Sequence, residues 1–322
     1  MKKKTTNIRE VVEVIDKADN ILILPHILPD GDTIGSSIAL YLALKKIGKH
    51  PFILLNEELP YNIQFLPCEY VFNEVDESLS FDLVISTDCS DLDRLGDRNE
   101  YVYRAKNSLN IDHHITNTYF ADINIVDPKA AATGEIVYFL IKALGVSITK
   151  DMATCLYAAL STDTGSFKYD NTSAQTHRIV AELLEKDVDL NFVTTQIYQN
   201  KPLHRVKLLS EVLNTLEFYF NNKLAVLYIT EEMMDKVGVK AEDTDGIIEF
   251  ARDISGVEVG VLLKEMGKNK IKVGFRAKYD VDVSEIASAF HGGGHKKASG
   301  CTIHDNMENA KRLVVERMEN YL

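Results

Sequence analysis

Cysteine is scarce in this sequence, and long apolar runs are missing altogether. The four cysteines are far apart and form no C-x-x-C pair, which argues against thiolate-bound structural zinc and against a disulfide framework. Cys89 is expected to be a small buried thiol. No run approaches the roughly 18 apolar residues that span a bilayer, and polar residues follow the basic start Met1–Lys4. We therefore expect a cytoplasmic protein that makes no membrane contact.

Basic residues are also fewer than acidic ones. The chain has 36 Lys and Arg against 48 Asp and Glu, a formal net charge of −12. This charge disfavours capture of long nucleic acid by a broad basic surface. A nucleotide substrate remains compatible with it, because bound divalent metals can invert the local field.

The 322 residues are enough for two domains, each with its own core. Residues 1–190 alternate strand-like runs (21–24, 51–55, 81–87, 108–111) with helix-like runs (33–47, 133–144, 152–160, 174–184), which predicts a doubly wound, mostly parallel α/β sheet. A helical connector is expected at residues 191–216, which include a helical run over 201–216. Residues 217–322 form a second, smaller α/β domain, with strands at 224–229, 257–264 and 270–275, a hairpin turn at 265–269, and helices at 284–290 and 307–321.

Acidic and histidine residues collect where these segments end. His26, Asp30 and Asp32 follow the first strand, Asp88 follows the third, Asp112-His113-His114 follows the fourth, and Asp163 follows the helix at 152–160. In an open parallel sheet, the carboxyl ends of the strands share one edge, where ligands bind. Carboxylates gathered there would repel one another unless a cation held them. The arrangement predicts a metal site, with two metals favoured.

The donor types narrow the metal and its chemistry. Carboxylates with few imidazoles and no thiolates favour Mn²⁺, with Mg²⁺ as the second choice, over Zn²⁺. Two such ions form a clamp for in-line attack at phosphorus. We also expect Asp112 to orient the imidazole of His113, and the helix beginning near Thr33 to offer backbone N–H groups to an anion. A single Asp after a strand is more often a turn or cap residue, so the prediction depends on the whole constellation. His50, His177, His204 and His304 are expected to have structural or surface roles.

These motifs resemble, in order, the four motifs of the DHH phosphoesterases, and Gly292-Gly293-Gly294-His295 resembles the mark of the DHH-associated domain. The resemblance covers nearly the whole chain. It implies that His26, Asp30 and Asp88 hold one metal. It implies a second metal on Asp32, Asp88, His113 and Asp163, bridged through Asp88. His114 would contact the scissile phosphate and assist departure of the leaving oxygen, so Asp88 and His114 are the candidate catalytic residues.

The glycine run suggests where a substrate phosphate is held. Gly292, Gly293 and Gly294 could present successive backbone N–H groups as an anion nest, with His295 as a further donor. Arg276, near the end of a predicted strand, offers a bidentate fork for phosphate. Alone, a glycine triplet is more often a flexible turn, and Arg276 would be a solvated strand end. Together with the metal motifs, we expect Arg276, Gly293, Gly294 and His295 to bind substrate. His291 stands where the family usually has another Gly, and its effect on binding of the substrate phosphate is left open.

Within the family, the compact layout is similar to oligoribonucleases of the NrnA type. That resemblance implies an Mn-dependent phosphoesterase. Such an enzyme degrades short RNA oligonucleotides to mononucleotides and removes the 3′-phosphate from 3′-phosphoadenosine 5′-phosphate. The alternative is a soluble phosphodiesterase for cyclic-di-AMP or its linear product pApA, which shares the same motifs. A metal-dependent nucleotide sensor without turnover is a third option, disfavoured because all six ligands are present. Homodimer formation, the metal used in the cell and the extent of domain closure are left open.

Overall fold

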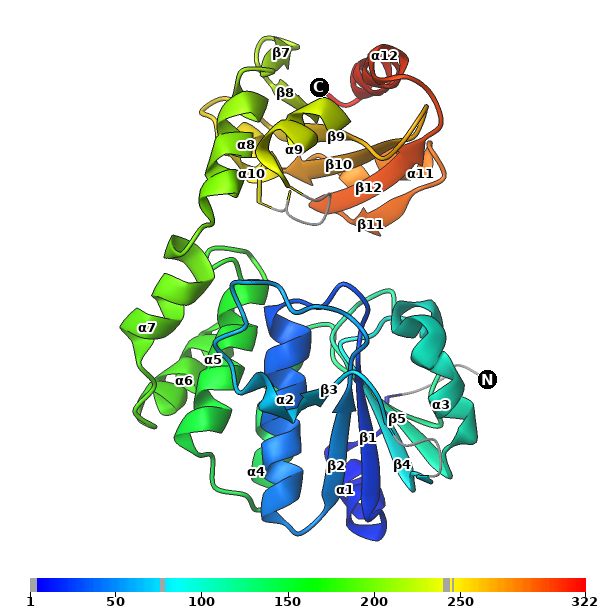
Figure 1. Ribbon diagram of the computed structural model, residues 1–322, viewed down its shortest axis with the longest axis vertical. Coiled ribbons are helices and arrows are strands. Elements are labelled where there is room, and N and C mark those ends of the chain that lie inside the picture. Colours follow the sequence, from blue (N-terminus) through cyan, green and yellow to red (C-terminus); the bar gives the residue numbers. More distant parts are fainter. Residues whose placement is uncertain (1–4, 76–78, 240–243, 245) are drawn as a thin grey trace. The chain divides into compact units, whose positions relative to one another are not determined.

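The computed structural model describes residues 5–75, 79–239, 244 and 246–322, and it divides the chain into two compact units, Met1–Asn200 and Lys201–Leu322 (Figure 1). Each unit is built on its own six-stranded sheet. Helices α7 (Leu190–Thr194) and α8 (Leu203–Leu213) lie in the predicted connector, one on each side of this division. Among the described residues, no helix is long and apolar enough to cross a membrane. The exact domain boundaries stay a prediction.

The first sheet is parallel throughout, with the strand order β3-β2-β1-β4-β5-β6. Its strands are β1 (Asn20–Pro25), β2 (His50–Leu54), β3 (Val71–Phe72), β4 (Leu83–Thr87), β5 (Asn107–Asp112) and β6 (Ile123–Val126). Every residue of β4, and all but the first of β1, is buried, as is typical of a parallel sheet covered on both faces. The predicted doubly wound sheet is therefore confirmed. The strand order reverses between β1 and β4, and such a switch point is where ligands bind in open α/β sheets.

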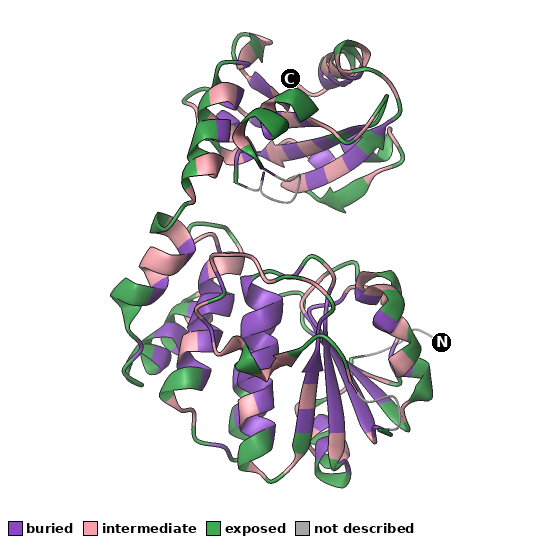
Figure 2. Ribbon diagram, in the orientation of Figure 1, coloured by how far each residue is buried: buried purple, intermediate pink, exposed green. Residues whose placement is uncertain are grey.

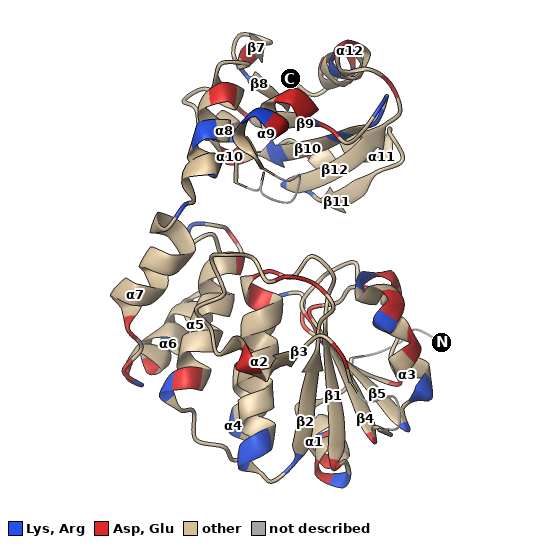
Figure 3. Ribbon diagram, viewed as in Figure 1, with Lys and Arg blue, Asp and Glu red and all other residues tan. Residues whose placement is uncertain are grey.

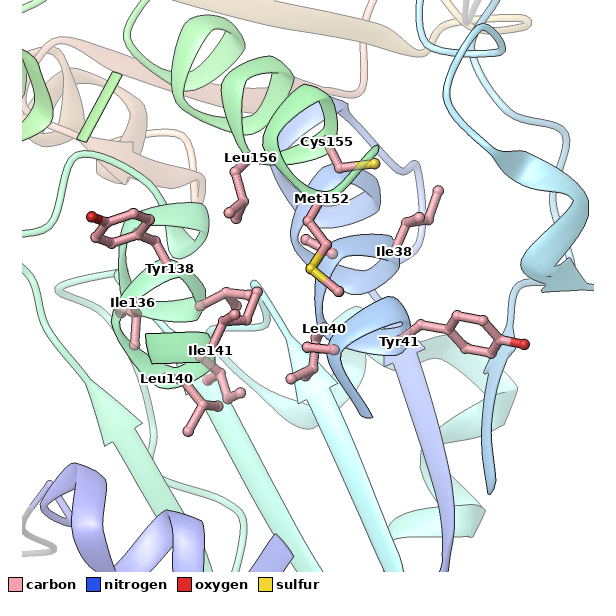
Figure 4. Close-up of a cluster of buried hydrophobic side chains, with 14 of the residues drawn as sticks. Ile38, Leu40, Tyr41, Ile136, Tyr138, Leu140, Ile141, Met152, Cys155 and Leu156 are labelled. Carbon is pink, nitrogen blue, oxygen red and sulfur yellow. The ribbon is translucent and has the colours of Figure 1, made fainter. Parts of the chain in front are cut away.

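Helices α2 (Gly31–Lys46), α4 (Thr133–Ala143) and α5 (Lys150–Asp163) contribute to the largest core of this unit, and Figure 4 shows some of their buried side chains. Helix α2 is buried along most of its length (Figure 2). Gly35 permits its close approach to α5, because an added Cβ would lie 2.4 Å from the backbone oxygen of Cys155. The other helices of the unit are α1 (Ile8–Lys17), α3 (Glu100–Arg104) and α6 (Ala174–Leu184).

Local chemistry explains where these helices begin and end. The Asn7 side chain caps α1, and Ser173 and Thr176 form a reciprocal capping box at α6. Gly145 follows α4 with φ of +72°, a left-handed conformation that suits a glycine after a helix. Helix α2 begins at Gly31 rather than near Thr33, so the predicted start is late by two residues.

The second sheet has the order β11-β12-β10-β9-β8-β7, in which β8 and β9 are parallel and the other pairs antiparallel. Its strands are β7 (Glu217–Tyr219), β8 (Leu224–Ile229), β9 (Val259–Glu265), β10 (Ile271–Ala277), β11 (Gly293–His295) and β12 (Ala298–Ile303). The helices are α8, α9 (Glu231–Val237), α10 (Ile248–Arg252), α11 (Val283–Ser288) and α12 (Met307–Met318). The antiparallel β9–β10 pair confirms the predicted hairpin.

Strand β8 shows why this unit has two apolar clusters. Leu224 and Val226 belong to one cluster, which α11 and α12 complete, whereas Ala225 and Leu227 belong to the other, which includes residues of α8 and α10. Side chains alternate between the two faces of a strand, so one apolar strand supplies both clusters. The sheet is therefore covered on both faces, like the first one.

Candidate metal centre

The acid and histidine side chains converge at the carboxyl end of the first sheet. His26 directly follows β1, Asp88 directly follows β4, and His113 directly follows β5. Asp163 is the last residue of α5. Figure 3 shows acidic loop segments at this end of the sheet and the acidic first turn of α2. The cluster thus lies at the switch point between β1 and β4, which a ligand site in this topology would occupy.

His26 and Asp88 form the most buried part of the cluster. His26 Nε2 lies 3.4 Å from Asp88 Oδ2 and 3.8 Å from Asp30 Oδ2. On the other side of the ring, His26 Nδ1 lies 2.7 Å from the backbone oxygen of Ile27. A carbonyl oxygen only accepts, so this contact is a hydrogen bond when Nδ1 carries the proton, and Nε2 is then the ring atom that faces the carboxylates. His26, Asp30 and Asp88 can together surround one ion.

His113 occupies the centre of the remaining cluster. Its Nε2 lies 3.5 Å from Asp163 Oδ2, 3.6 Å from Asp88 Oδ1 and 3.9 Å from Asp32 Oδ2. Two further groups with spacing suitable for an ion follow: Asp32 with His113 and Asp163, and Asp88 with His113 and His114. The structure therefore brings together all six predicted ligands. Asp88 presents Oδ2 to His26 and Oδ1 to His113, an arrangement compatible with the predicted bridge.

The charges of the cluster fit a divalent cation. Burial raises the pKa of Asp32 and of Asp163 well above the usual carboxyl value, and the negative charge of Asp88 raises both further. Burial lowers the pKa of His26, but the hydrogen bonds and charges of Asp30 and Asp88 outweigh it and raise that pKa to about 10. Burial also opposes ionisation of Asp88, yet the hydrogen bond from His26 and the charge of His113 lower its pKa. Carboxylates packed this closely need positive charge, which a metal ion bound by oxygen and imidazole donors would supply.

Asp88 has an unusual backbone. Its φ is +61°, in the left-handed region that side-chain-bearing residues rarely enter, although Asp and Asn tolerate it better than most. Its backbone N–H donates to the carbonyl of Ile111 on the neighbouring strand at 2.9 Å. The side chain is 3% exposed. Strain of this kind is found at functional sites, where the surrounding structure holds it.

Asp32 is fixed by three donors. Its Oδ2 accepts a hydrogen bond from the backbone N–H of Thr133 at 2.7 Å, and its Oδ1 accepts from the N–H of Gly134 and the hydroxyl of Ser36, both at 2.9 Å. Asp32 itself is 1% exposed. A buried carboxylate with this many donors has a fixed orientation, as a metal ligand needs.

The predicted anion site at the start of α2 is wrong. The carboxylate of Asp30 accepts hydrogen bonds from the backbone N–H groups of Asp32 and Thr33, both at 3.0 Å, and so caps this helix. The first donors of α2 are therefore already used within the chain.

Asp112 orients His114 and not His113, which corrects the prediction. Asp112 Oδ1 lies 2.7 Å from His114 Nδ1, and Asp112 Oδ2 accepts from the side-chain amide of Asn117 at 2.5 Å. His113 Nδ1 instead lies 3.2 Å from the backbone oxygen of Ala130. Burial lowers the pKa of His114, but the hydrogen bond with Asp112 and the charge of Asp88 outweigh it and raise that pKa to about 9.

The predicted phosphate-binding residues lie in the second unit. Gly293, Gly294 and His295 form the exposed strand β11, which pairs with β12. The backbone N–H of Gly292 donates to the carbonyl of Ala287 at 2.9 Å. The prediction that all three glycines offer their N–H groups to an anion is therefore wrong for Gly292. Their role in binding substrate stays a prediction.

Arg276 lies within β10 and is not a solvated strand end. Its Nε lies 3.3 Å from Glu249 Oε1, and its Nη1 donates to the backbone oxygen of Phe275 at 3.1 Å. The side chain is 33% exposed. The pair with Glu249 fixes the orientation of the guanidinium, which a phosphate site would require.

Sequence reasoning missed three residues that touch the predicted ligands or their partners. Thr133 contacts Asp32 and Asp88, Asn117 contacts Asp112, and Arg94 Nη2 lies 3.1 Å from His26 Nδ1. One signal was available for Thr133: the small residues Ala130–Gly134 run into the start of the helix predicted at 133–144, and such runs permit close backbone approach. The prediction for Cys89 is confirmed, since this thiol is fully buried.

Comparison with known proteins agrees with these features. Residues 20–160 match the model for the N-terminal domain of the DHH family, and residues 205–322 match that for the DHHA1 domain. The chain is 33% identical over 317 residues to a protein of Thermus thermophilus named bifunctional oligoribonuclease and PAP phosphatase NrnA, covering 98% of this chain and 94% of that relative. A Bacillus subtilis protein of the same name is 29% identical over 311 residues, covering 95% and 96% of the two chains.

The fold has a close match among solved structures. An exopolyphosphatase-related protein from Bacteroides fragilis has a TM-score of 0.90 and 27% sequence identity, covering 98% of this chain and 96% of the other. The similarity extends over both units, and the motif residues of the first unit meet in one cluster. The chain belongs to the DHH family, with an N-terminal DHH domain and a C-terminal DHHA1 domain.

Proposed function

We propose that this protein is a metal-dependent phosphoesterase. It degrades short oligoribonucleotides to mononucleotides and removes the 3′-phosphate from 3′-phosphoadenosine 5′-phosphate. The observation that carries the proposal is the carboxylate and imidazole cluster at the sheet switch point. It occurs in a chain that is similar over nearly its whole length to relatives named oligoribonuclease and PAP phosphatase.

In this proposal, His26, Asp30 and Asp88 hold one divalent ion, and Asp32, Asp88, His113 and Asp163 hold the second. When bound, such ions polarise phosphoryl oxygens and lower the pKa of water. The spacing of the side chains supports the assignment, because Asp88 directs one carboxylate oxygen toward His26 and the other toward His113. We propose Mn²⁺ as the metal, with Mg²⁺ as the second choice.

His114 is proposed to assist the leaving group. Its Nδ1 faces the buried carboxylate of Asp112 at 2.7 Å, which holds a proton at that nitrogen. The carboxylate of Asp112 favours the protonated ring, whose second proton would be at Nε2. A positioned imidazolium can donate that proton to the departing oxygen of a phosphoester. Asp112 would keep the ring oriented throughout, supported by Asn117.

The second unit is proposed to bind the terminal phosphate of a short substrate. Gly293 and Gly294 are exposed on β11, where nothing lies within 4 Å of the place that a Cβ on Gly293 would take, and His295 adds a donor. Arg276, oriented by Glu249, supplies the planar fork that suits phosphate. We therefore propose short RNA oligonucleotides and nucleotide phosphates as substrates, with the enzyme acting in the cytoplasm.

The experiment that tests the proposal measures Mn²⁺-dependent product formation from four substrates in parallel: pApA, a short RNA oligomer, 3′-phosphoadenosine 5′-phosphate and cyclic-di-AMP. Hydrolysis of the first three, with little turnover of the cyclic substrate, is expected. Asp88→Asn is the control for contaminating activity, because it keeps the shape of the residue and removes its charge. Dominant turnover of cyclic-di-AMP would replace this proposal with a signal-degrading phosphodiesterase, and no turnover of any substrate would reject both.

A further inference from the structure

The first turn of α4 touches two of the proposed metal ligands at once. The backbone N–H of Thr133 donates to Asp32 Oδ2 at 2.7 Å, and the hydroxyl of the same residue donates to Asp88 Oδ1 at 2.9 Å. The N–H of the next residue, Gly134, donates to Asp32 Oδ1 at 2.9 Å. Thr133 is fully buried, and the two carboxylates are 1% and 3% exposed. These contacts are therefore shielded from solvent and hold their partners firmly.

Helix α4 depends on this contact for its cap. Its N-cap residue, Ala132, has no side chain that could accept a hydrogen bond from the first turn. The carboxylate of Asp32, which belongs to α2, accepts two of those N–H groups instead. A helix N-terminus favours hydrogen-bond acceptors and negative charge, so this end of α4 suits a carboxylate. The position of the Asp32 side chain is thus set by α4 as well as by its own helix, α2.

The hydroxyl of Thr133 has a separate effect on Asp88. Asp88 Oδ1 lies 3.6 Å from His113 Nε2, whereas its Oδ2 lies 3.4 Å from His26 Nε2. Rotation of the carboxylate about its χ2 bond would move both oxygens away from these partners. A hydrogen bond from a buried hydroxyl to Oδ1 opposes that rotation.

We infer that Thr133 is a positioning residue that holds Asp32 and Asp88 in the relative orientation that two divalent ions require. The inference deepens the proposed function and rests on its metal centre. Thr133 itself touches no reacting atom in this role. Residues that orient metal ligands through hydrogen bonds commonly change metal affinity by about 10- to 100-fold when they are replaced.

The simpler explanation is that the hydroxyl only satisfies a buried polar position. Thr215 provides a matched control for that case. It is also buried, its hydroxyl donates to the backbone oxygen of Val212 at 2.7 Å and accepts from the N–H of Tyr228 at 3.0 Å, and it lies in the second unit. Thr215→Val therefore reports the cost of losing a buried threonine hydroxyl away from the metal centre.

The experiment compares Thr133→Val, Thr133→Ser, Thr215→Val and the unaltered protein, each stripped of metal with a chelator. Mn²⁺ binding is measured by calorimetric titration, and the exchange coupling between neighbouring Mn²⁺ ions by electron paramagnetic resonance. We expect Thr133→Val to bind the more weakly held ion about tenfold less tightly or worse and to lose the coupled signal. Thr133→Ser should restore both, because it keeps the hydroxyl. Thr215→Val should lower only the unfolding temperature.

Two results would overturn the inference. If Thr133→Val binds two coupled ions as tightly as the unaltered protein does, the positioning role is rejected and the proposed function stays intact. If the unaltered protein bound no Mn²⁺, the proposed function and the inference would fail together. Unfolding of each metal-free variant, followed by circular dichroism, shows whether Thr133→Val is folded. Should it be unfolded, the comparison of Thr133→Ser with Thr133→Ala decides by the same two readouts.

Discussion

Asp82 joins separate segments of the first unit by its charge. Its Oδ2 accepts hydrogen bonds from the backbone N–H groups of Asp19 and Asn20 at 3.1 and 3.0 Å, just where β1 begins. Lys106 Nζ lies 2.6 Å from Oδ1, just before β5. The hydrogen bond from Lys106, followed by those from the two N–H groups, lowers the pKa of Asp82 to about 2. The ionised form is therefore the one that stabilises the fold.

Asp82→Ala should lower the free energy of unfolding at neutral pH by about 1 kcal/mol, the scale of hydrogen bonds to a charged group that is partly exposed. In the native state this carboxyl has a pKa of about 2, below the roughly 3.9 of an unfolded chain. Its contribution is thus present above about pH 4 and is lost as the pH falls toward 2. Urea unfolding of both proteins at pH 7, 5 and 3 checks this. A difference that stayed constant across these pH values would contradict the assignment.

His295→Ala should raise the KM for a dinucleotide and leave Mn²⁺ affinity unchanged, because His295 lies on β11 and the proposed ligands all lie in the first unit. The loss of one donor to a phosphate corresponds to roughly tenfold in KM. Steady-state kinetics and metal titration of the same preparations measure the two effects. His304→Ala, an exposed histidine of the same unit, is the control. An unchanged KM would remove His295 from the proposed phosphate site.

Single residues also show how far sequence reasoning reaches. The convergence of the six proposed ligands was predictable, because they follow segments whose apolar pattern marks a strand or helix end, and the parallel topology then gathers those ends. The residues that hold these side chains in place by hydrogen bonds could not be predicted. Thr133 is 101 residues from Asp32 in the chain, and only tertiary packing joins them. The choice between His113 and His114 as the partner of Asp112 depends on side-chain rotamers, which sequence spacing leaves open.

At the scale of secondary structure elements, the crossing of α2 and α5 depends on the absence of a side chain at Gly35. An added Cβ on Gly35 would lie 2.4 Å from the backbone oxygen of Cys155 and 3.2 Å from Ala159 Cβ. Backbone cannot yield as a flexible side chain can. The absence of a side chain at Gly35 therefore sets the distance between the two helices. This distance affects the site, because Asp32 lies in the first turn of α2.

Gly35→Ala should destabilise the first unit by about 1–3 kcal/mol, because overpacking forces the helices apart. The sign of the change in the free energy of unfolding is informative, because replacing glycine by alanine within a helix otherwise stabilises a protein by up to about 1 kcal/mol. Thermal unfolding in the presence of a chelator measures the effect without a contribution from metal. Gly274→Ala is the control, because its Cβ would approach only Ile248 Cδ1, at 3.4 Å. Equal or greater stability of the Gly35 variant would show that α5 can move aside.

The same scale explains which elements could be predicted. Long periodic runs such as α2, α5 and α12 were found with small boundary errors, because many apolar positions agree on one period. Strand β11 was missed, since its three residues are two glycines and a histidine and carry no strand pattern. It exists because it pairs with β12. Helix α2 was expected to begin late because Asp30, taken as a ligand alone, is also its cap.

At the scale of the whole molecule, the proposed metal ligands and the proposed phosphate-binding residues lie in different units, each with its own core. All six proposed metal ligands lie in Met1–Asn200, and all four proposed phosphate-binding residues lie in Lys201–Leu322. Each unit has its own sheet with buried apolar residues on it. Units of this kind can fold separately.

A fragment of residues 1–200 should therefore fold and bind Mn²⁺ as tightly as the full chain, while its turnover of a dinucleotide falls sharply. Calorimetric titration with Mn²⁺ and a product assay on the same preparation test the two statements. Activity in the fragment equal to that of the full chain would show that the second unit holds no essential substrate contact. Weak Mn²⁺ binding by a folded fragment would mean that the second unit contributes to the metal centre.

The left-handed backbone of Asp88 has a consequence for reading related sequences. The position is constrained twice, by the charge that the proposed metal bridge needs and by a conformation that glycine, asparagine and aspartate tolerate best. A descendant that abandoned catalysis but kept its fold would be expected to drift to asparagine or glycine here, since other replacements would cost backbone energy as well. Asn or Gly at this position therefore marks a protein that has kept the scaffold for some other purpose, such as binding a nucleotide without cleaving it.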